Sequence, residues 1–515
     1  MAEPQGRTVK DLMSSPVVTA SPSDTVAQAA ESMKAAGVGS VVVVDGDRPV
    51  GILTERDLVK FSASGGEAEG AKVSEWMTAD PDTVKPSEEV AAAFKSLSEH
   101  NYRHIPVVDG DGALQGIVSL RDMMRVARIV PVDPVTEVPP GLEGVVVAET
   151  KIGDVRGKEG FFHYRQYSAV ELAEKRMLED VWHLLFQGEL PTKSEREKFI
   201  EEITPLRVIP DDVMKVLPSL ANLGDCFSPL DAARSAFSLV VSSQDFKPSL
   251  DADHEELRKQ AMLSCAVFPS LVMALYRLSE GKEPVDPDPN LPYAANYLYM
   301  LTGEEPDPEN ARAVEQYLIA TIDHGFNAST FTARVITSTG ADLGSAVLGA
   351  LGALSGPLHG GAPSRALDML RDIGSIEKTD DWLRDAVGSG RRLMGFGHRV
   401  YKTDDPRGTL LRGVAERLDK DGERVRLAKH VEKRAVEILQ ELKPGRSLYP
   451  NVEFYAGIVM DMVGMPPPLF TPTFGCSRVI GWTAQIMEQA ADNRLIRPSA
   501  HYIGPEPPQP VPDPE

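Results

Sequence analysis

Residues 394–408 read Met-Gly-Phe-Gly-His-Arg-Val-Tyr-Lys-Thr-Asp-Asp-Pro-Arg-Gly, and the rest of the chain is organised around this stretch. Two glycines flank an aromatic residue and let the backbone approach a ligand with no Cβ in the way. His398 can give or take a proton near neutral pH, and Arg407 carries a planar fork that suits a carboxylate. The composition indicates a site for a small anion with proton chemistry. A glycine-rich loop bearing a solvated charge cluster is the alternative.

Three more stretches in the later part of the chain carry residues of these kinds: Asp-His-Gly-Phe-Asn-Ala-Ser-Thr-Phe at 323–331, Ser-Gly-Pro-Leu-His-Gly-Gly-Ala at 355–362 and Pro-Asn-Val-Glu-Phe-Tyr-Ala-Gly at 450–457. Together with residues 394–408 they resemble four motifs of the citrate synthase family. The resemblance covers roughly residues 141–504, and four motifs in the family's order are not expected by chance.

The family's chemistry forms a carbon–carbon bond from an acyl thioester and needs three groups. A carboxylate removes a weakly acidic proton, one donor stabilises the enol oxygen, and another donor polarises the acceptor ketone. The resemblance implies that Glu453 performs the first task, His359 the second and His398 the third.

The resemblance also implies how the acceptor, oxaloacetate, is held. His324, Arg407 and Arg478 match the positions that bind this dicarboxylate. Arg497 resembles an arginine that reaches in from a neighbouring subunit, which implies a homodimer or a higher homo-oligomer. Acetyl-CoA is the implied co-substrate, and neither a cofactor nor a metal is implied. Phe474 and the four tryptophans are expected to serve packing only.

Glu453 departs from the family pattern, because most citrate synthases carry Asp at this position. On an unchanged backbone the extra methylene moves the carboxylate by about 1 Å or more, a displacement that can cost on the order of a hundredfold in rate. Either the local backbone compensates, or activity is slow, or the acyl donor differs. Residues 362–365 also differ from the family's commoner polar run, so the specificity for the thioester stays open.

Length, charge and cysteine content restrict the class of protein. A chain of 515 residues is expected to form two to four domains. A formal charge of −22 argues against binding to nucleic acid, but local arginines can still attract an anionic substrate. Cys226, Cys265 and Cys476 lie far apart without the spacing of a metal site, which predicts buried thiols in a reducing cytoplasm.

The early part of the chain contains an internal repeat. Val-Lys-Asp-Leu-Met at 9–13 returns as Val-Ser-Glu-Trp-Met at 73–77, and Gly-Ile-Leu-Thr-Glu-Arg-Asp at 51–57 returns as Gly-Ile-Val-Ser-Leu-Arg-Asp at 116–122. Each copy is expected to fold as helix, buried strand, turn, strand and helix. The pattern resembles the cystathionine-β-synthase (CBS) domain, and two copies form that family's usual tandem pair.

The local signals in the first copy are specific enough to place its elements. Asp24 is predicted to cap a helix that continues to Ala36 and ends at Gly37. Buried strands are predicted at 41–44 and 50–53, joined by an Asp-Gly turn.

The CBS resemblance implies a nucleotide site at the start of the last helix of each copy. Thr54 with Asp57, and Ser119 with Asp122, match the hydroxyl and carboxylate that hold the ribose of an adenine nucleotide. The helix N-terminus favours phosphate, so AMP, ADP or ATP would suit the site. Alternatively, Thr54 and Ser119 merely cap their helices, with each aspartate balancing the helix dipole.

The predicted fold is multi-domain, with an N-terminal α/β CBS pair followed by a mainly α-helical citrate synthase fold of large and small domains. The predicted limits are as follows: a tail at 1–8, CBS domains at 9–62 and 73–126, a proline-rich linker at 127–140, a synthase domain at 141–503 with its small domain at about 358–467, and a disordered proline-rich tail at 504–515.

Helical periodicity dominates the synthase part. One amphipathic helix is predicted over 169–188, and a long helical stretch over 410–442 is broken near 419–422. A further helical run is predicted from Ser477 to Ala490. The most apolar run, 346–358, is too short to span a bilayer, so a soluble, cytoplasmic protein is expected.

Three functions remain open at this point. The first is a citrate synthase regulated by nucleotide binding to the CBS pair. The second is a 2-methylcitrate synthase that uses propionyl-CoA, since one methylene in the donor is worth only about 1–3 kcal/mol. The third is a nucleotide-binding regulatory protein whose synthase domain is catalytically weak.

Overall fold

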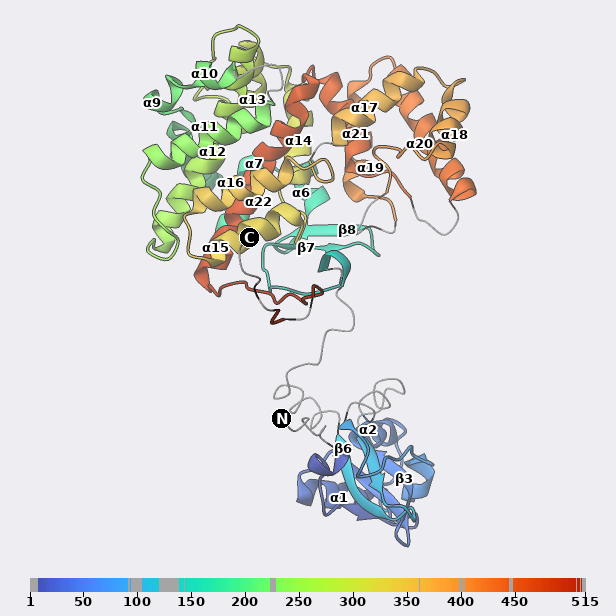
Figure 1. The fold of residues 1–515 in the computed structure, drawn as a ribbon. Coiled ribbons are helices and arrows are strands. Elements are labelled where there is room, and N and C mark those ends of the chain that lie inside the picture. The colour runs from blue at the N-terminus through green and yellow to red at the C-terminus, as the bar shows by residue number, and fades with distance from the viewer. Residues whose placement is uncertain are drawn as a thin grey trace. The chain divides into compact units, whose positions relative to one another are not determined.

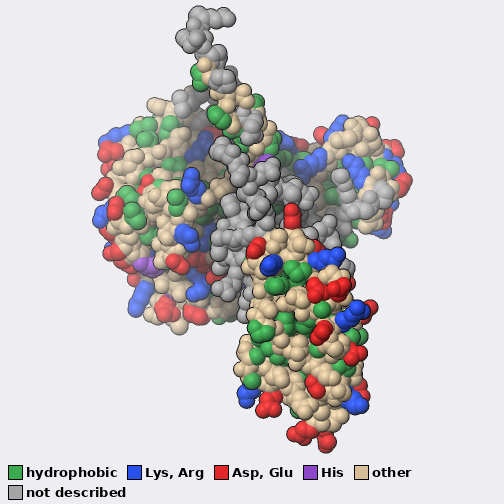
Figure 2. Space-filling model, turned by 60° about the horizontal axis from the view of Figure 1, so that its bottom comes forward, with side chains coloured by type: hydrophobic (Ala, Val, Ile, Leu, Met, Phe, Trp, Pro, Cys, Tyr) green, Lys and Arg blue, Asp and Glu red, His purple; other side chains and the backbone are tan. Residues whose placement is uncertain are grey.

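The computed structural model describes the following residues of the chain: 8–90, 93, 104–119, 139–142, 144–222, 228–360, 362–397, 401, 403–443, 448–505, 507–509 and 511. The chain divides into two compact units, Met1–Val145 with Ala500–Glu515, and Val146–Ser499 (Figure 1). Acidic and basic side chains are interspersed on the face shown in Figure 2. We call the two parts the front unit and the synthase unit, and each is described by itself.

The described residues of the front unit form two β-sheets. Its four-stranded sheet has the order β1-β2-β3-β4, with β1 parallel to β2 and the other neighbours antiparallel; the strands are Thr19–Ala20, Ser40–Asp45, Arg48–Thr54 and Thr78–Ala79. The second sheet has two antiparallel strands, β5 (His104–Val108) and β6 (Leu114–Ser119). Both hairpins carry a register shift at matching places, between Val43 and Val44 and between Val107 and Val108. The predicted repeat is therefore visible in the register of the two hairpins.

The helices of the front unit are short and lie beside these strands; they are η1 (Val9–Asp11), α1 (Val26–Ala36), α2 (Glu55–Ala63) and α3 (Val73–Trp76). Gly37 ends α1 in the left-handed conformation at φ 65°, as the sequence predicts. The predicted cap at Asp24 is wrong by one residue, because Thr25 is the N-cap. Thr25 accepts from the Gln28 amide and the Gln28 side chain accepts from the Thr25 amide, while the Asp24 carboxylate instead accepts from the Ser21 amide.

The synthase unit begins with a small antiparallel sheet and is otherwise helical. Its strands are β7 (Gly153–Arg156), β8 (Phe161–Tyr164) and β9 (Tyr167–Ser168). The helices that follow, apart from single-turn pieces, are α6 (Ala169–Lys175), α7 (Leu178–Gln187), α8 (Lys193–Ile203), α11 (Pro229–Ser243), α12 (His254–Ser279), α13 (Tyr293–Thr302), α14 (Pro308–Thr321), α15 (Ala328–Ser338), α16 (Leu343–Leu354), α17 (Ala362–Ile373), α18 (Thr379–Gly388), α19 (Pro406–Leu418), α20 (Glu423–Leu442), α21 (Val452–Met462) and α22 (Phe470–Ala491). The predicted fold class, an α/β front part and a mainly helical synthase part, is confirmed.

The core of the synthase unit is centred on α22 and α12, which are buried along most of their lengths (Figure 1). α12 is the helix among the described residues that is long and apolar enough to cross a membrane, and 78% of its apolar window is buried inside the protein. It is therefore a buried core helix. The prediction that residues 346–358 are the most apolar run did not take α12 into account.

The predicted helix over 169–188 is wrong, because it is two helices with a break at Arg176 and Met177. Arg312, on α14, explains the break. Its guanidinium donates to the Ala173 and Arg176 carbonyls at 2.6 and 2.8 Å, which satisfies the end of α6. The side chain of Glu315, one turn further along α14, accepts from the first amide of α7 at 3.1 Å.

Other local expectations are met. The stretch 410–442 breaks as predicted into α19 and α20, and Gly422 occupies the left-handed region at φ 69°. The run predicted over Ser477–Ala490 is helical, although α22 begins earlier, at Phe470. Cys265 and Cys476 are buried free thiols, while Cys226 lies outside the described residues.

Candidate active site

The Gly-Phe-Gly loop, residues 395–397, is hydrogen-bonded to the N-cap residue of α21. The Asn451 amide donates to the Gly395 carbonyl at 2.9 Å, and the Asn451 side chain donates to the Gly397 carbonyl at 3.0 Å. Gly395 has φ 79°, and a Cβ there would lie 2.9 Å from the Cβ of Phe454. The close approach at Gly395 is therefore to the helix that carries Glu453, and not to a ligand as the sequence analysis expected.

Asp405 joins two parts of the site through one carboxylate. It accepts from the Arg407 amide and Nε at 3.0 Å each, and from Arg407 Nη2 at 2.7 Å. The same carboxylate accepts from the Val452 amide at 3.1 Å, next to Glu453. Burial opposes the charge of Arg407, but Asp405 outweighs it and raises the pKa of the guanidinium. Asp405 therefore fixes Arg407 relative to the first turn of α21.

Glu453 lies in that first turn, where its amide donates to the side chain of the N-cap residue Asn451 at 3.0 Å. Burial raises the pKa of Glu453 to about 7, although the charges of Arg407 and Arg392 oppose the shift. A carboxyl group with a pKa near the working pH can both take and return a proton.

His359 follows α16 and is held by a small polar cluster at the start of α15. Its Nε2 lies 2.8 Å from Ser329 Oγ, and that hydroxyl lies 2.7 Å from Asn327 Oδ1. The indole of Trp482 donates to the same hydroxyl at 3.2 Å, so Trp482 does more than the packing predicted for it. Burial, and then the charge of Arg478, lower the pKa of His359 to about 4. This histidine is neutral at physiological pH.

His324 occupies a turn between α14 and α15. Its Nε2 lies 3.0 Å from the hydroxyl of Tyr401, a residue of the 394–408 stretch. The preceding residue, Asp323, is buried and accepts from the Gly325 amide at 3.1 Å, which closes the turn around His324. The structure therefore brings the motif at 323–331 against the motif at 394–408.

Arg478 lies inside α22 with only 3% of its surface exposed. Within the described part of the chain its Nε and Nη1 have no hydrogen-bond partner. Burial lowers its pKa to about 10, with the Asp323 carboxylate opposing the shift. Its guanidinium lies 4.7 Å from the centroid of the Phe474 ring, so the prediction that Phe474 serves packing only omits this cation–π contact. A buried, unpaired guanidinium is expected to receive an anion.

These groups share one electrostatic environment. The charge of Arg478 reaches His359, that of Arg407 reaches both Arg478 and Glu453, and each contributes to the shifted pKa values given above. Two predicted site residues are not placed with them. His398 lies outside the described residues, and Arg497 lies in the segment that follows α22. A cavity of about 470 Å³ on another face of α19, lined by Glu174, Thr403 and Arg417 among others, contains none of the predicted site residues.

The nucleotide residues predicted in the front unit are placed only in part. Thr54 is the N-cap of α2, and its amide and hydroxyl donate to the Asp57 carboxylate at 3.1 and 2.7 Å. Lys60 Nζ lies 3.1 Å from the other oxygen of Asp57. Ser119 ends β6, and Asp122 lies outside the described residues. Thr54 therefore occupies the N-cap position, but its hydroxyl donates to Asp57 and accepts from no helix amide in the described part of the chain, and the ribose-binding alternative stays open.

Several residues that support the site were not predicted from the sequence; they are Asp323, Ser329, Tyr401, Asp405 and Trp482. Ser329 had a usable signal, because Asn327 is a good N-cap and a hydroxyl two residues later faces the helix start. Trp482 and Tyr401 had none, since their contacts join segments far apart in the chain. Among the described residues no group of three or more His, Cys, Asp or Glu side chains could hold a metal ion.

Comparison with known proteins adds to this geometry. Residues 141–499 match the family described as "Citrate synthase, C-terminal domain", and residues 9–64 and 73–128 each match the family described as "CBS domain". The chain is 41% identical over 368 residues to a citrate synthase of Haloferax volcanii, covering 71% of this chain and 95% of that protein. It is 37% identical over 377 residues to a 2-methylcitrate synthase of Mycobacterium tuberculosis, covering 73% and 93% of the two chains.

Solved structures give the same result. The crystal structure of citrate synthase from Thermotoga maritima is similar with a TM-score of 0.65 and 36% identity, over 73% of this chain and 98% of that one. The ternary complex of citrate synthase from Thermoplasma acidophilum with carboxymethyl coenzyme A and oxaloacetate is also similar. Its TM-score is 0.67 at 31% identity, over 73% of this chain and 98% of that one.

Proposed function

The chain belongs to the citrate synthase family and carries two CBS domains, and from this premise we propose that it condenses acetyl-CoA with oxaloacetate to give citrate and coenzyme A. The observation that carries the proposal is the buried guanidinium of Arg478, unpaired among the described residues, in the same electrostatic environment as Glu453 and His359. An anionic acceptor supplies the negative charge that pairs with this guanidinium.

In the proposed mechanism Glu453 removes a proton from the methyl carbon of acetyl-CoA. Its pKa of about 7 suits this task, because a buried carboxylate is a stronger base than one in water. His359, neutral with a pKa of about 4, donates a hydrogen bond to the thioester oxygen as the enol forms. The Ser329 hydroxyl donates its hydrogen to Asn327 Oδ1 and contacts Nε2 of His359, so it holds the imidazole ring in place.

The acceptor is held by charge. Arg407 and Arg478, together with His324, bind oxaloacetate, and His398 polarises its ketone. The enol carbon attacks the ketone carbon, and water then hydrolyses the resulting citryl thioester to release coenzyme A. His324, whose Nε2 contacts Tyr401, is positioned by the stretch that also carries Arg407.

Release of free thiol tests this function. The full chain is incubated with acetyl-CoA or propionyl-CoA, with and without oxaloacetate. Oxaloacetate-dependent thiol release that is faster with acetyl-CoA supports citrate synthase. The reverse preference supports 2-methylcitrate synthase, a second candidate favoured by the similarity to the mycobacterial enzyme of that name. Thiol release from neither donor would leave a regulatory protein with a weak synthase domain.

The neighbouring subunit is proposed to complete the site through Arg497, which lies beyond the end of α22 in this chain. Co-expression of Arg497→Ala and Glu453→Gln chains tests this. Each variant alone should be nearly inactive. A hybrid dimer contains one intact site of two, so isolated hybrids should have up to about half of wild-type activity and the co-expressed mixture up to about a quarter. Absence of restoration in isolated hybrids would show that Arg497 acts within its own chain.

The front unit is proposed to bind an adenine nucleotide and to regulate the synthase. Support comes from Thr54 and Asp57 at the N-terminus of α2, where a hydroxyl, a carboxylate and the amide groups of the first helical turn lie together. Calorimetry of the full chain with AMP, ADP and ATP tests binding, with Asp57→Ala and Asp122→Ala as variants. A several-fold change in synthase rate or oxaloacetate affinity on binding would be typical of allosteric coupling of about 1–3 kcal/mol. The two buried thiols agree with the cytoplasmic location that we propose.

A further inference from the structure

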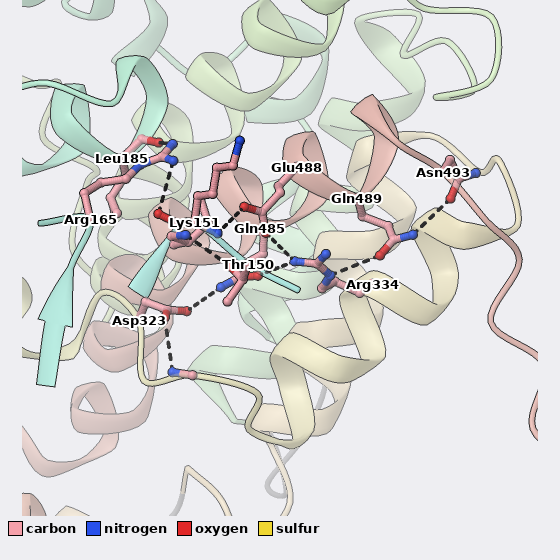
Figure 3. A network of polar contacts seen from close by, with 12 residues as sticks. Thr150, Lys151, Arg165, Leu185, Asp323, Arg334, Gln485, Glu488, Gln489 and Asn493 are labelled. Carbon is pink, nitrogen blue, oxygen red and sulfur yellow. Dashed lines mark hydrogen bonds and ion pairs between the residues drawn. The ribbon is translucent and has the colours of Figure 1, made fainter. Parts of the chain in front are cut away.

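A polar network joins α15 and α22 and includes Asp323, the residue before His324 (Figure 3). Its centre is Arg334 on α15, whose side chain is 4% exposed. The guanidinium donates to three side chains of α22: Gln485 Oε1 at 2.7 Å, Glu488 Oε2 at 2.7 Å and Gln489 Oε1 at 3.1 Å. α22 is the helix that also carries Arg478.

Arg334 determines how the amide of Gln485 is oriented. A guanidinium only donates, so it must meet the oxygen of the amide, and the NH₂ group of Gln485 then faces the other way. In that direction lies Asp323 Oδ1, 3.4 Å from Gln485 Nε2 (Figure 3). The other oxygen of Asp323 accepts from the Gly325 amide at 3.1 Å, on the far side of His324 in the chain.

We propose that Gln485 is a positioning residue for His324. Its amide, oriented by Arg334, holds the Asp323 carboxylate and thereby fixes the turn 323–325 that presents His324 to oxaloacetate. The proposal rests on the proposed function, because it assumes that His324 binds oxaloacetate. It adds a residue that does not contact substrate but determines where a substrate-binding residue lies.

A neutral donor suits this position better than a charged group. Asp323 is buried, burial raises its pKa, and the charge of Arg478 opposes that shift. The other charged or titratable groups around the pair are Arg334 and Glu488 in the network and Tyr164, whose hydroxyl donates to the Asp323 carbonyl at 3.2 Å. A second carboxylate facing Asp323 would repel it, whereas the amide holds it without changing the charge near Arg478.

Two isosteric variants form a matched test. Gln485→Glu and Gln489→Glu both replace an amide on α22 that accepts from Arg334, and both keep an oxygen for that contact. They differ in the opposite end of the side chain, because the Gln489 amide faces Asn493 Oδ1 at 3.2 Å and not Asp323. We expect Gln485→Glu to raise the KM for oxaloacetate on the order of tenfold with a smaller effect on kcat, and Gln489→Glu to change it less than about twofold.

The pH dependence separates positioning from a general loss of structure. Two buried carboxyl groups in contact share a proton, so the carboxyl group introduced by Gln485→Glu is protonated at lower pH and can again donate to Asp323. The KM difference between Gln485→Glu and wild type should therefore shrink toward about pH 6 and widen toward about pH 9. Gln485→Met removes the donor without adding charge and should give a smaller rise in KM that does not vary with pH.

The outcomes are distinct. An unchanged KM in Gln485→Glu at the alkaline end of that range, or an equal rise in Gln489→Glu, would overturn the positioning role. Absence of condensation by the wild-type protein would instead overturn the proposed function. In that case calorimetric titration of oxaloacetate into wild type and both variants still tests the inference, since a misplaced His324 weakens binding in Gln485→Glu alone.

Discussion

Asp57 in the front unit and Arg478 in the synthase unit are both buried charged residues, with 7% and 3% of their surfaces exposed. Asp57 accepts two hydrogen bonds from Thr54 and pairs with Lys60, so its charge is balanced locally. Arg478 keeps two guanidinium nitrogens without a partner among the described residues. The contacts of Asp57 stabilise the start of α2 without a ligand. The burial of Arg478 costs free energy unless an anionic ligand pairs with the guanidinium.

The difference shows where a ligand can be inferred from structure alone. An unsatisfied buried cation is evidence for an anion, because the energetic cost of burying it must be recovered on binding. A satisfied cap is compatible with a nucleotide but does not require one. The predictions below test this contrast, from the largest expected effect to the smallest.

Glu453→Gln should remove most of the activity of the synthase unit. An amide cannot accept the methyl proton, so kcat should fall by on the order of 10³-fold while the KM for oxaloacetate changes little. Steady-state thiol release measures this. Substantial turnover in the variant would place the base elsewhere and remove Glu453 from the mechanism.

Arg478→Met should weaken oxaloacetate binding by roughly 2–4 kcal/mol and yet raise the melting temperature of the unliganded protein, because an unpaired buried charge is replaced by an apolar side chain. Arg207→Met is the matched control. Arg207 is also buried, and its Nε and Nη2 also lack a hydrogen-bond partner among the described residues, but its Nη1 donates to the Leu291 carbonyl at 2.8 Å and its Nη2 lies 3.7 Å from Glu179 Oε1, so its charge is paired. Its removal leaves the buried Glu179 carboxylate without its cationic partner and should lower the free energy of unfolding by roughly 3–5 kcal/mol. Equal destabilisation by both variants would contradict the contrast.

The pH profile should report Glu453. Only the ionised carboxylate is a base, so kcat/KM should rise as pH passes through the pKa of about 7. His359, with a pKa of about 4, stays neutral over this range and adds no second limb. The raised pKa of Glu453 also means that its contribution to stability is present at low pH and is lost as pH rises from about 4.5 to about 7. Both dependences should be absent in Glu453→Gln, and their persistence there would assign them to another group.

Thr54→Ala should cost only about 1 kcal/mol of stability in the front unit, the usual value of an N-cap. Thr25→Ala is the matched control, because Thr25 is the N-cap of α1 and, like Thr54, its amide donates to the side chain three residues later, here Gln28. Denaturant unfolding should show similar losses, whereas calorimetry with AMP, ADP or ATP should show weaker binding in Thr54→Ala alone. Equal nucleotide affinities in the two variants would show that Thr54 does not contribute to nucleotide binding.

The sequence was most informative where function and local geometry coincide. The resemblance of four motifs to a known family pointed to His324, His359, Arg407 and Glu453, and Gly37 and Gly422 marked helix limits that the structure has. The fold class could be predicted for the same reason. The roles of the site residues remain proposals.

Contacts between distant segments could not be predicted. The break between α6 and α7 depends on Arg312, more than a hundred residues away in the chain, and no local breaker marks it. The lack of a partner at Arg478, among the residues that the structure describes, is a property of three-dimensional packing, so residue type alone does not reveal it. Asp24 was the predicted cap of α1, but Thr25 occupies that place, because it exchanges hydrogen bonds with Gln28 three residues later.

The carboxylate of Asp405 accepts hydrogen bonds from both Arg407 and the first amide of α21, and this shared contact has an evolutionary consequence. Because one side chain sets both the anion-binding arginine and the helix that carries the base, a substitution there changes two properties in a single step. Lineages that acquire a new acyl donor are therefore expected to accumulate their changes outside this junction, in stretches such as 362–365, where one property can drift while the other is retained.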